Sequence, residues 1–278
     1  MALYIVSTPI GNLGDMTHRA VEVLGTADRI LAEDTRRTGV LCRHYGIGTP
    51  LVSVHEHNEA ARAGQVVEWL DAGEVLALVS DAGTPLVSDP GARLVRAALD
   101  AGHDVVPVPG ASALLAALVG SGLDTEPFMF FGFLPRTGRV RAERLAELAA
   151  LPHTGVVYES PERLVGLLEE LMERTDPDRR VVVARELTKL HEEHRRGSLH
   201  EVAAHYRDAG VKGEVVVMLA GAEGVSAEVD EEAAAALARA LLEDGGRPSV
   251  VAKEVARRLG VPRNRAYEIV QGLKPDAD

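Results

Sequence analysis

A repeated alternation between short apolar runs and amphipathic stretches constrains the fold of this sequence more than any other feature. Within the first 110 residues, five runs rich in Val, Ile and Leu are bounded by Gly, Pro, Asp or Asn: Leu3–Ser7, Ile30–Ala32, Leu51–Val54, Val75–Val79 and Val105–Val108. Runs of this kind are typical of buried strands. Helical patterns separate them, at Thr17–Leu24, Arg37–Tyr45, Asn58–Leu70 and Ala92–Leu99. This order predicts a mostly parallel sheet with helices on both faces.

A second series of the same kind follows. Its expected strands are Phe128–Phe133, Gly155–Tyr158, Val181–Arg185 and Glu214–Leu219, and its expected helices are Val140–Leu148, Glu162–Glu173 and Leu199–Arg207. The series predicts a second α/β domain, joined to the first by or just after a helix at Ala111–Val119. We therefore expect an N-terminal α/β domain in residues 1–120 and a second α/β domain in residues 121–222.

The remaining residues, 223–278, predict a helical tail. An alanine-rich acidic helix is expected at Ser226–Asp244, and Val250–Leu259 and Arg263–Leu273 then follow with a Gly-containing turn between them, which is the outline of a helix-turn-helix. From residue 247 to residue 274 there are seven basic and two acidic residues. Two interpretations stay open. The tail is either an exposed helical appendage or a small module that contacts nucleic acid through Arg263 and Arg265 at the start of its second helix.

Composition narrows the class of protein. The chain has 278 residues, of which 46% are apolar and 26% charged, as in soluble globular proteins. Cys42 is the single cysteine, so internal disulfides and Cys-based zinc sites are excluded and a reducing compartment is favoured. No apolar run approaches the ~20 residues of a membrane helix, and the start lacks the basic segment of a signal peptide. We expect a cytoplasmic protein without a membrane partner. The net charge of −12 disfavours nucleic-acid binding over the whole surface.

Polar or Gly/Pro-rich turns follow seven of the expected strands. These turns are Thr8-Pro-Ile-Gly-Asn, Glu33-Asp-Thr-Arg-Arg, His55-Glu-His-Asn-Glu, Ser80-Asp-Ala-Gly-Thr-Pro, Pro109-Gly-Ala-Ser-Ala, Glu159-Ser-Pro-Glu-Arg and Glu186-Leu-Thr-Lys. Ligands of parallel α/β sheets bind outside the carboxyl ends of the strands. The turns therefore predict a ligand-binding cleft between the two domains.

The same turns restrict the kind of ligand. The sequence contains no Gly-x-x-x-x-Gly-Lys-Ser/Thr, and no Gly-x-Gly-x-x-Gly follows the first strand, so nucleoside triphosphates and dinucleotides are not favoured. Gly83-Thr-Pro and Gly110-Ala-Ser allow close approach of the backbone without a cluster of N–H groups aimed at phosphate. Such loops suit a neutral adenosine moiety with a zwitterionic tail.

Taken together, the motifs resemble those of the tetrapyrrole methylase superfamily, and more narrowly its ribosomal branch, the small-subunit rRNA cytidine 2′-O-methyltransferases. The resemblance extends from Leu3 to Gly221, and the helical tail is similar to the helix-turn-helix extension of that branch. Porphyrin and corrin members carry Gly-Pro-Gly-Asp in the first loop, where this chain has Thr8-Pro-Ile-Gly-Asn. Their Gly-Asp-Pro is replaced here by Gly83-Thr84-Pro85. Both departures favour the ribosomal branch.

The resemblance implies S-adenosylmethionine as the methyl donor, held in the cleft, and a homodimer. The implied reaction is 2′-O-methylation of a cytidine ribose in small-subunit (16S) ribosomal RNA, with the assembled small subunit as the partner. The implied donor contacts are Pro9, Ile10, Gly83, Thr84, Val87, Ser112, Ala113, Glu159 and Leu187. Because the carboxylate of Gly-Asp-Pro is missing, the contact that it makes in relatives is not transferred to Thr84.

A ribose hydroxyl is a weak nucleophile, so a base or a cation near it should accelerate the transfer. The candidates at the expected rims are Asp34, His57, Glu59, Glu186 and Lys189, with Arg36 and Arg185 as phosphate holders. The sequence does not choose among them, and Asp34 with Arg36 fits a purely structural ion pair equally well.

Two histidine pairs, His55 with His57 and His191 with His194, are conceivable metal ligands. Nothing in the sequence brings the pairs together and the chemistry needs no metal, so no metal site is expected. Two other functions stay open: methylation of a tetrapyrrole or of a modified protein side chain by a member of the same superfamily, and non-catalytic RNA binding through the basic tail.

Overall fold

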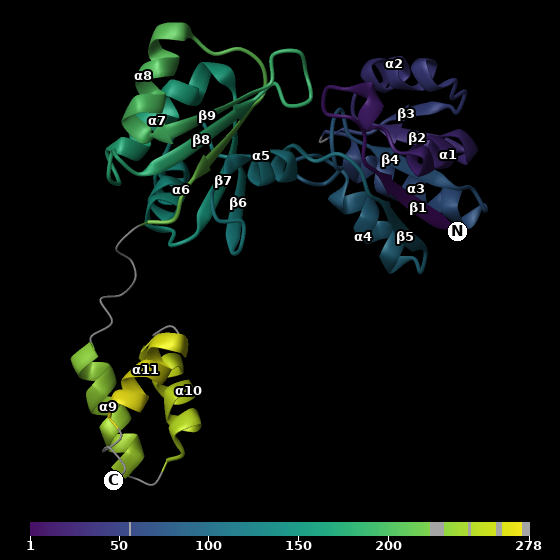
Figure 1. Cartoon of the computed structure of the whole chain (residues 1–278). Coiled ribbons are helices and arrows are strands. Elements are labelled where there is room, and N and C mark those ends of the chain that lie inside the picture. Colours follow the sequence, from purple (N-terminus) through teal and green to yellow (C-terminus); the bar gives the residue numbers. More distant parts are fainter. Residues whose placement is uncertain (56, 223–230, 244–245, 260–262, 274–278) are drawn as a thin grey trace. The chain divides into compact units, whose positions relative to one another are not determined.

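Residues 1–55, 57–222, 231–243, 246–259 and 263–273 are described by a computed structural model of the chain. They form two units. The first contains residues 1–149 and 153–220 and holds two five-stranded sheets; the second contains residues 150–152 and 221–278 (Figure 1). None of the helices in the described ranges combines the length and apolarity of a membrane span.

The first sheet is entirely parallel, with strand order β3-β2-β4-β1-β5. Its strands are β1 (Ala2–Val6), β2 (Arg29–Ala32), β3 (Leu51–Ser53), β4 (Leu76–Val79) and β5 (Asp104–Val108). The connecting helices are α1 (His18–Thr26), α2 (Thr35–Tyr45), α3 (Glu59–Asp71) and α4 (Ala92–Asp100), with a 3₁₀ turn η1 (Leu13–Asp15) before α1. The predicted parallel α/β fold is confirmed.

Apolar side chains on both faces of the first sheet explain its continuous apolar strands. On one face, Leu31 and Leu78 pack with residues of α3 and α4 such as Leu70. On the other, Ile30 and Val79 pack with residues of α1 and α2. Successive strand residues point to opposite faces, so a strand covered on both sides is apolar at every position.

The second sheet is mixed, with order β6-β7-β10-β8-β9. Its strands are β6 (Phe128–Phe133), β7 (Thr154–Glu159), β8 (Arg180–Arg185), β9 (Glu193–Ser198) and β10 (Val215–Leu219). Only β6 and β7 pair in parallel; β10 is antiparallel to both β7 and β8, and β9 is antiparallel to β8. The carboxyl ends of β7 and β8 therefore still lie at one edge, beside the start of β10, where Val215 is in register with Glu159 and Arg185.

Strand β9 was not expected from the sequence. Its residues, Glu-His-Arg-Arg-Gly-Ser, contain no apolar side chain, and the strand lies at the edge of the sheet. A polar edge strand lacks the alternation that marks a half-buried strand and is a common protection against edge-to-edge pairing.

Helices complete this unit. They are α5 (Ala113–Ser121), α6 (Arg139–Ala150), α7 (Leu164–Met172), which follows the 3₁₀ turn η2 (Pro161–Arg163), and α8 (Leu199–Ala209). Helix α5 is apolar on most sides and packs on the second sheet through Ala117 and Leu118. Helix α8 starts with a capping box between Ser198 and Glu201.

Three helices are described in the second unit: α9 (Glu231–Glu243), α10 (Pro248–Leu259) and α11 (Arg263–Gly272). They share an apolar cluster of their own that includes Ala238, Val255 and Val270. The helical tail is therefore confirmed. The first residues of the predicted helix Ser226–Asp244 and the turn at Gly260 lie outside the described residues, as does the side chain of Arg263. The boundaries 1–120, 121–222 and 223–278 stay predictions.

Candidate functional site

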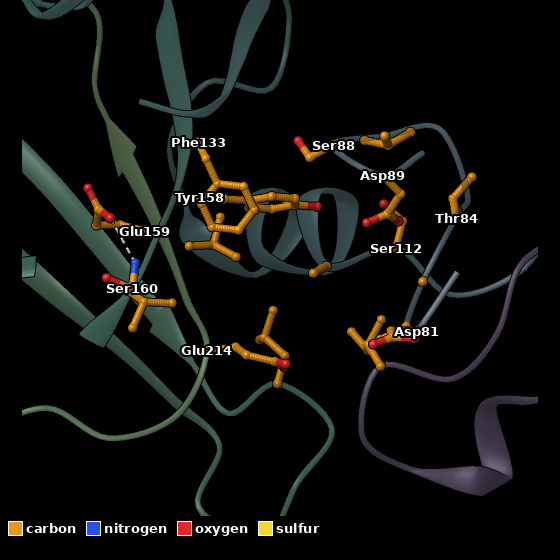
Figure 2. A pocket seen from close by; sticks show the side chains of 18 of the residues that line it. Asp81, Thr84, Ser88, Asp89, Ser112, Phe133, Tyr158, Glu159, Ser160 and Glu214 are labelled. Atoms are coloured by element: carbon orange, nitrogen blue, oxygen red, sulfur yellow. Dashed lines mark hydrogen bonds between the residues drawn. The ribbon is translucent and has the colours of Figure 1, made fainter. Parts of the chain in front are cut away.

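A cavity of about 340 Å³ opens where strands of both sheets end, within the size range of small-molecule sites. Figure 2 shows side chains from loops of the first sheet, among them Asp81, Thr84 and Asp89, around the same space as Tyr158, Glu159 and Glu214 of the second. The lining residues are Ile10, Arg37, Asp81, Ala82, Gly83, Thr84, Val87, Ser88, Asp89, Ser112, Ala113, Phe133, Tyr158, Glu159, Ser160, Pro161, Leu187, Glu214, Val215 and Val216. We call this space the first cavity.

Hydrogen bonds join the loops that follow β1, β4 and β5. Thr8 and Gly83 exchange both backbone hydrogen bonds, at 2.9 and 3.0 Å, as an isolated antiparallel bridge. The Thr84 hydroxyl lies 3.1 Å from the hydroxyl of Ser7 and donates to the carbonyl of Ala111 over 3.1 Å. Gly83 has a φ of 82°, a left-handed conformation that favours glycine. These contacts make the wall of the first cavity a single connected structure.

Backbone strain is concentrated in the loops at the first cavity. Leu86 and Ser88, in the loop before α4, have φ values of 73° and 72°. Glu186 and Thr188, which flank the lining residue Leu187, have φ values of 51° and 66°. Left-handed backbone at non-glycine residues costs about 1–3 kcal/mol each and accumulates at functional sites. The strain therefore supports a binding function for these loops.

From the second sheet, Tyr158 and Glu159 at the end of β7 contribute to the first cavity. The Tyr158 ring contacts Phe130 and Phe133, with centroid separations of 4.8 and 5.5 Å. Its hydroxyl accepts a 3.1 Å hydrogen bond from the backbone N–H of Leu114, at the start of α5. Burial raises the pKa of Tyr158, so the phenol stays neutral. Glu159 is 2% exposed, and one carboxylate oxygen accepts from the N–H of Ser160.

Acidic side chains outnumber basic ones in the lining of the first cavity. Four carboxylates line it, on Asp81, Asp89, Glu159 and Glu214, whereas Arg37 supplies the one cationic side chain among the described lining residues. Arg37 pairs with Asp81, and Arg163 and Lys189, outside the lining, pair with Glu159 and Glu214 at 3.2 Å each. Burial raises the pKa of Asp89, and the negative charge of Asp81 raises it further. Such a lining favours a ligand that carries positive charge.

A second cavity, of about 180 Å³, adjoins the first. Arg37 and Asp81 line both cavities and form an ion pair with 3.3 Å between Nη1 and Oδ2. The other carboxylate oxygen of Asp81 accepts a 3.0 Å hydrogen bond from the backbone N–H of Asp34. The remaining lining residues are Thr8, Pro9, Gly11, Leu13, Thr38, Val40, Leu41 and Ser80.

The residues expected to contact a donor lie together in the structure. Those that line the first cavity are Ile10, Gly83, Thr84, Val87, Ser112, Ala113, Glu159 and Leu187, whereas Pro9 lines the second cavity. Sequence reasoning missed Asp81, Asp89 and Tyr158. Asp81 and Asp89 flank the Gly83-Thr84-Pro85 turn and Tyr158 directly precedes Glu159, so their proximity to recognised motifs was the available signal.

The expected catalytic residues Asp34, Arg36, His57, Glu186 and Lys189 do not line either cavity. Asp34 is the N-cap of α2, and its carboxylate is held by the backbone N–H of Arg36 at 2.8 Å and by the Arg36 guanidinium at 2.7 Å. Hydrogen bonds from the Arg36 side chain and backbone lower the pKa of Asp34, which makes its carboxylate a weak base. His57 is exposed and packs edge-on against His55.

Glu59, Glu186 and Lys189 have identifiable structural contacts. The buried Glu59 carboxylate accepts hydrogen bonds from the N–H groups of Gly91 and Arg93, at 3.0 and 2.7 Å, and so caps α4. Lys189 pairs with Glu186 at 2.9 Å and with the cavity residue Glu214 at 3.2 Å. Burial opposes the charge of Lys189, yet its hydrogen bonds to Glu186 and Glu214 raise its pKa overall. Lys189 is therefore a cation beside the rim and not a proton acceptor at neutral pH.

Arg185, the other expected phosphate holder, pairs with Glu193 on β9. Within the described ranges, no group of three or more His, Cys, Asp or Glu side chains is arranged to hold a metal ion.

Comparison with known proteins places this geometry in a family. Residues 2–203 match the family described as Tetrapyrrole (Corrin/Porphyrin) Methylases. A Synechocystis protein named "Ribosomal RNA small subunit methyltransferase I" is 44% identical over 275 residues, which cover 99% of both chains. Proteins of the same name from Mesorhizobium japonicum and Bacillus subtilis are 45% and 46% identical, covering 98% and 83% of this chain and 92% and 78% of their own.

Solved structures show the same fold at lower identity. Uroporphyrin-III C-methyltransferase from Thermus thermophilus, in complex with S-adenosylhomocysteine, aligns with a TM-score of 0.58 and 22% identity over 79% of this chain and 96% of its own. A cobalt precorrin-4 methyltransferase aligns with a TM-score of 0.61 and 20% identity over 79% of this chain and 94% of its own.

Proposed function

We propose that this chain, which belongs to the tetrapyrrole methylase family, transfers a methyl group from S-adenosylmethionine to the 2′-hydroxyl of a cytidine in small-subunit ribosomal RNA. That it is an S-adenosylmethionine-dependent methyltransferase acting on ribosomal RNA follows from its nearly full-length relatives. The observation that carries the substrate class is the 44% identity to a small-subunit rRNA methyltransferase over 99% of both chains.

The residues of the first cavity fit S-adenosylmethionine. The donor carries a sulfonium, an ammonium and one carboxylate, and so has a net positive charge. Of the four lining carboxylates, Asp81, Glu159 and Glu214 pair with Arg37, Arg163 and Lys189, and Asp89 supplies the negative charge that complements the donor. The turns at Gly83 and Ser112 bring backbone to the surface of the cavity, as a neutral adenosine requires. Leu187 and Val87 supply apolar surface for the uncharged parts. Ile10, Thr84, Ala113 and Glu159 complete the proposed donor site, with Pro9 at its edge.

When bound, S-adenosylmethionine supplies an already activated methyl group, so the protein mainly has to position the acceptor. Orientation of this kind can supply about 7–11 kcal/mol of a reaction barrier. The connected loops around Thr8, Gly83 and Thr84 provide a rigid wall for that purpose. Arg36 and Arg37, whose side chains are 89% and 65% exposed beside the cavities, are proposed to hold RNA phosphates.

The alternative acceptors have weaker support. The tetrapyrrole enzymes are only 20–23% identical, so their similarity shows a shared fold and carries no argument about the substrate. Purely non-catalytic RNA binding leaves the first cavity and its strained loops without a function. A cytoplasmic location and the assembled small subunit as partner are proposed with the same function.

A homodimer is also proposed. Large apolar side chains are exposed on α5 and on the edge strand β6, namely Leu115 (52%), Val119 (75%), Phe128 (37%) and Met129 (37%). Exposed apolar surface concentrated on neighbouring elements marks association surfaces, and a second copy of the chain is the partner that we propose for it.

Incubation with radiolabelled S-adenosylmethionine and isolated small ribosomal subunits tests the function. Label is expected in rRNA, and nuclease digestion should recover it as 2′-O-methylcytidine. Base-methylated nucleosides, or label on an added porphyrinoid while RNA stays unlabelled, would contradict the proposal.

A further inference from the structure

The second cavity has no assigned ligand, and its position relative to the first restricts what it can hold. A methyl transfer requires the attacking atom within about 3–3.5 Å of the methyl carbon. A site for the acceptor must therefore open onto the donor site. The second cavity meets this condition because Arg37 and Asp81 line both spaces.

The lining of the second cavity is chemically mixed. Leu13 and Val40 are 38% and 56% exposed at its surface, and Leu41 lies beside them. Apolar side chains of this kind suit the face of a base that has been flipped out of its stack into a pocket. Thr38 contributes a hydroxyl, and the exposed Arg37 guanidinium is available to a phosphate. Arg37 and Asp81 belong to both cavities, but the first cavity carries three further carboxylates, on Asp89, Glu159 and Glu214, whereas the second carries no further one among its described lining residues.

Asp81 is the carboxylate placed between the two cavities. Figure 2 shows it at the side of the first cavity that belongs to the loops of the first sheet, across from Glu214. Its side chain is 26% exposed, and its carboxylate is held by Arg37 and by the N–H of Asp34. Each carboxylate oxygen has two acceptor positions, so both contacts leave room for a further donor. Asp89 and Glu33 are its acidic neighbours, and burial raises the pKa of both.

We propose that the second cavity binds the target ribonucleotide and that Asp81 accepts the proton of its 2′-hydroxyl. This proposal rests on the function proposed above. As the bond between the 2′-oxygen and the methyl carbon forms, the carbon–sulfur bond breaks and its electron pair stays on sulfur as a neutral thioether. The hydroxyl proton passes to the Asp81 carboxylate. Asp81 is then a catalytic residue, in place of Asp34, whose carboxylate is committed to Arg36.

A binding cycle tests the proposal without relying on turnover. Small subunits are reconstituted with either cytidine or 2′-deoxycytidine at the position that the wild-type enzyme methylates, and their affinity is measured with S-adenosylhomocysteine present. A hydrogen bond to a charged group is worth about tenfold in affinity. We expect wild-type protein to prefer the hydroxyl form by about tenfold and Asp81→Asn to lose most of this preference. Because the two RNAs are compared on the same protein, any change in the affinity for S-adenosylhomocysteine cancels from the preference.

A second pair of variants tests the cavity itself, so that the proposal does not depend on the folding of one variant. Val40→Trp should fill the second cavity and weaken subunit binding at least about tenfold, with donor-product affinity retained. Leu99→Trp is the matched control, because Leu99 is similarly exposed (52%) on α4 and lines neither cavity.

Two results would overturn the proposal: an unchanged hydroxyl preference in Asp81→Asn, or equal subunit binding by the two tryptophan variants. Either can occur while wild-type protein still forms 2′-O-methylcytidine, in which case the proposed function stands. A wild-type enzyme that methylates no ribose would remove both proposals together.

Discussion

Asp89 shows how a single residue at the first cavity can lower the stability of the fold and favour ligand binding. Burial and the charge of Asp81 raise its pKa, so the ionised form of Asp89 destabilises the folded protein relative to the unfolded chain. A carboxyl group whose pKa is raised by folding stabilises the fold fully below its unfolded pKa, near 3.8, and loses that contribution as the pH rises through the folded pKa. At neutral pH the negative charge of Asp89 favours binding because it attracts a cationic ligand.

Replacement of Asp89 by Asn should therefore raise the free energy of unfolding at pH 7, and the difference from wild type should shrink as the pH falls toward 3.8. The same variant should bind S-adenosylmethionine more weakly, since one negative charge leaves the cavity. Urea unfolding at several pH values and calorimetric titration measure the two effects. Asp100→Asn, at an exposed position of α4, is the control. A less stable Asp89→Asn at pH 7 would contradict this account.

Site residues differ in how far the sequence revealed them. Gly83, Thr84 and Ser112 were identifiable because they lie in turns directly after strands and carry the family resemblance. Asp81 lies in the same quoted turn, but a sequence does not say which side chain of a turn faces the ligand. Tyr158 lies inside β7 and has the pattern of a core aromatic residue, so only the structure showed its contact with the cavity.

At the scale of elements, the start of α4 depends on a glycine and a distant carboxylate. Gly91 is the N-cap residue, with a φ of 127°, and Glu59 on α3 supplies the capping carboxylate that Gly91 lacks. A Cβ at Gly91 would lie 2.6 Å from Leu78 and 2.8 Å from Leu86, inside the core. The loop that enters α4 carries Thr84 and Asp89, so this helix start also fixes part of the first cavity.

Gly91→Ala should destabilise the protein by about 1–3 kcal/mol, from left-handed backbone strain alone, and more with the steric overlap. Gly64→Ala provides a matched comparison, because Gly64 lies within α3 and a Cβ there meets no atom within 4 Å. That variant should be stabilised by roughly 0.5–1 kcal/mol. Chemical denaturation measures both, and equal effects of the two substitutions would show that Gly91 has no special conformation.

The elements themselves were predictable where burial leaves a pattern. The central strands β1, β2 and β4 are covered on both faces and appear as largely apolar runs, with β4 buried at every position. Strand β9 has no such run, and the antiparallel pairing of β10 with β7 and β8 depends on contacts far apart in the chain. Local sequence identifies apolar strands well, but it does not specify strand partners or direction.

At the scale of the whole molecule, the net negative charge restricts where RNA can bind. The net charge is −12, so ribosomal RNA is repelled by much of the surface and binding has to depend on limited basic regions. The tail is one such region in the sequence. Deletion of residues 223–278 should leave donor affinity unchanged, weaken subunit binding by about tenfold or more and reduce its salt dependence. Unchanged affinity and salt dependence would assign the tail a different function.

Self-association is the second whole-molecule prediction. Val119→Asp places a charge in the exposed apolar surface of α5 and should convert a dimer into monomers. Multi-angle light scattering gives the mass directly. Leu99→Asp, at an exposed apolar position on α4, should leave it unchanged. A monomeric wild-type protein would show that this surface has another partner.

A crystal structure of the protein with S-adenosylhomocysteine tests the central claim most directly. We expect the nucleoside in the first cavity, in contact with the loops at Gly83 and Ser112, with its sulfur directed toward Asp81 and the second cavity. Ligand density at any other place on the molecule, with the first cavity filled by ordered water, would contradict it.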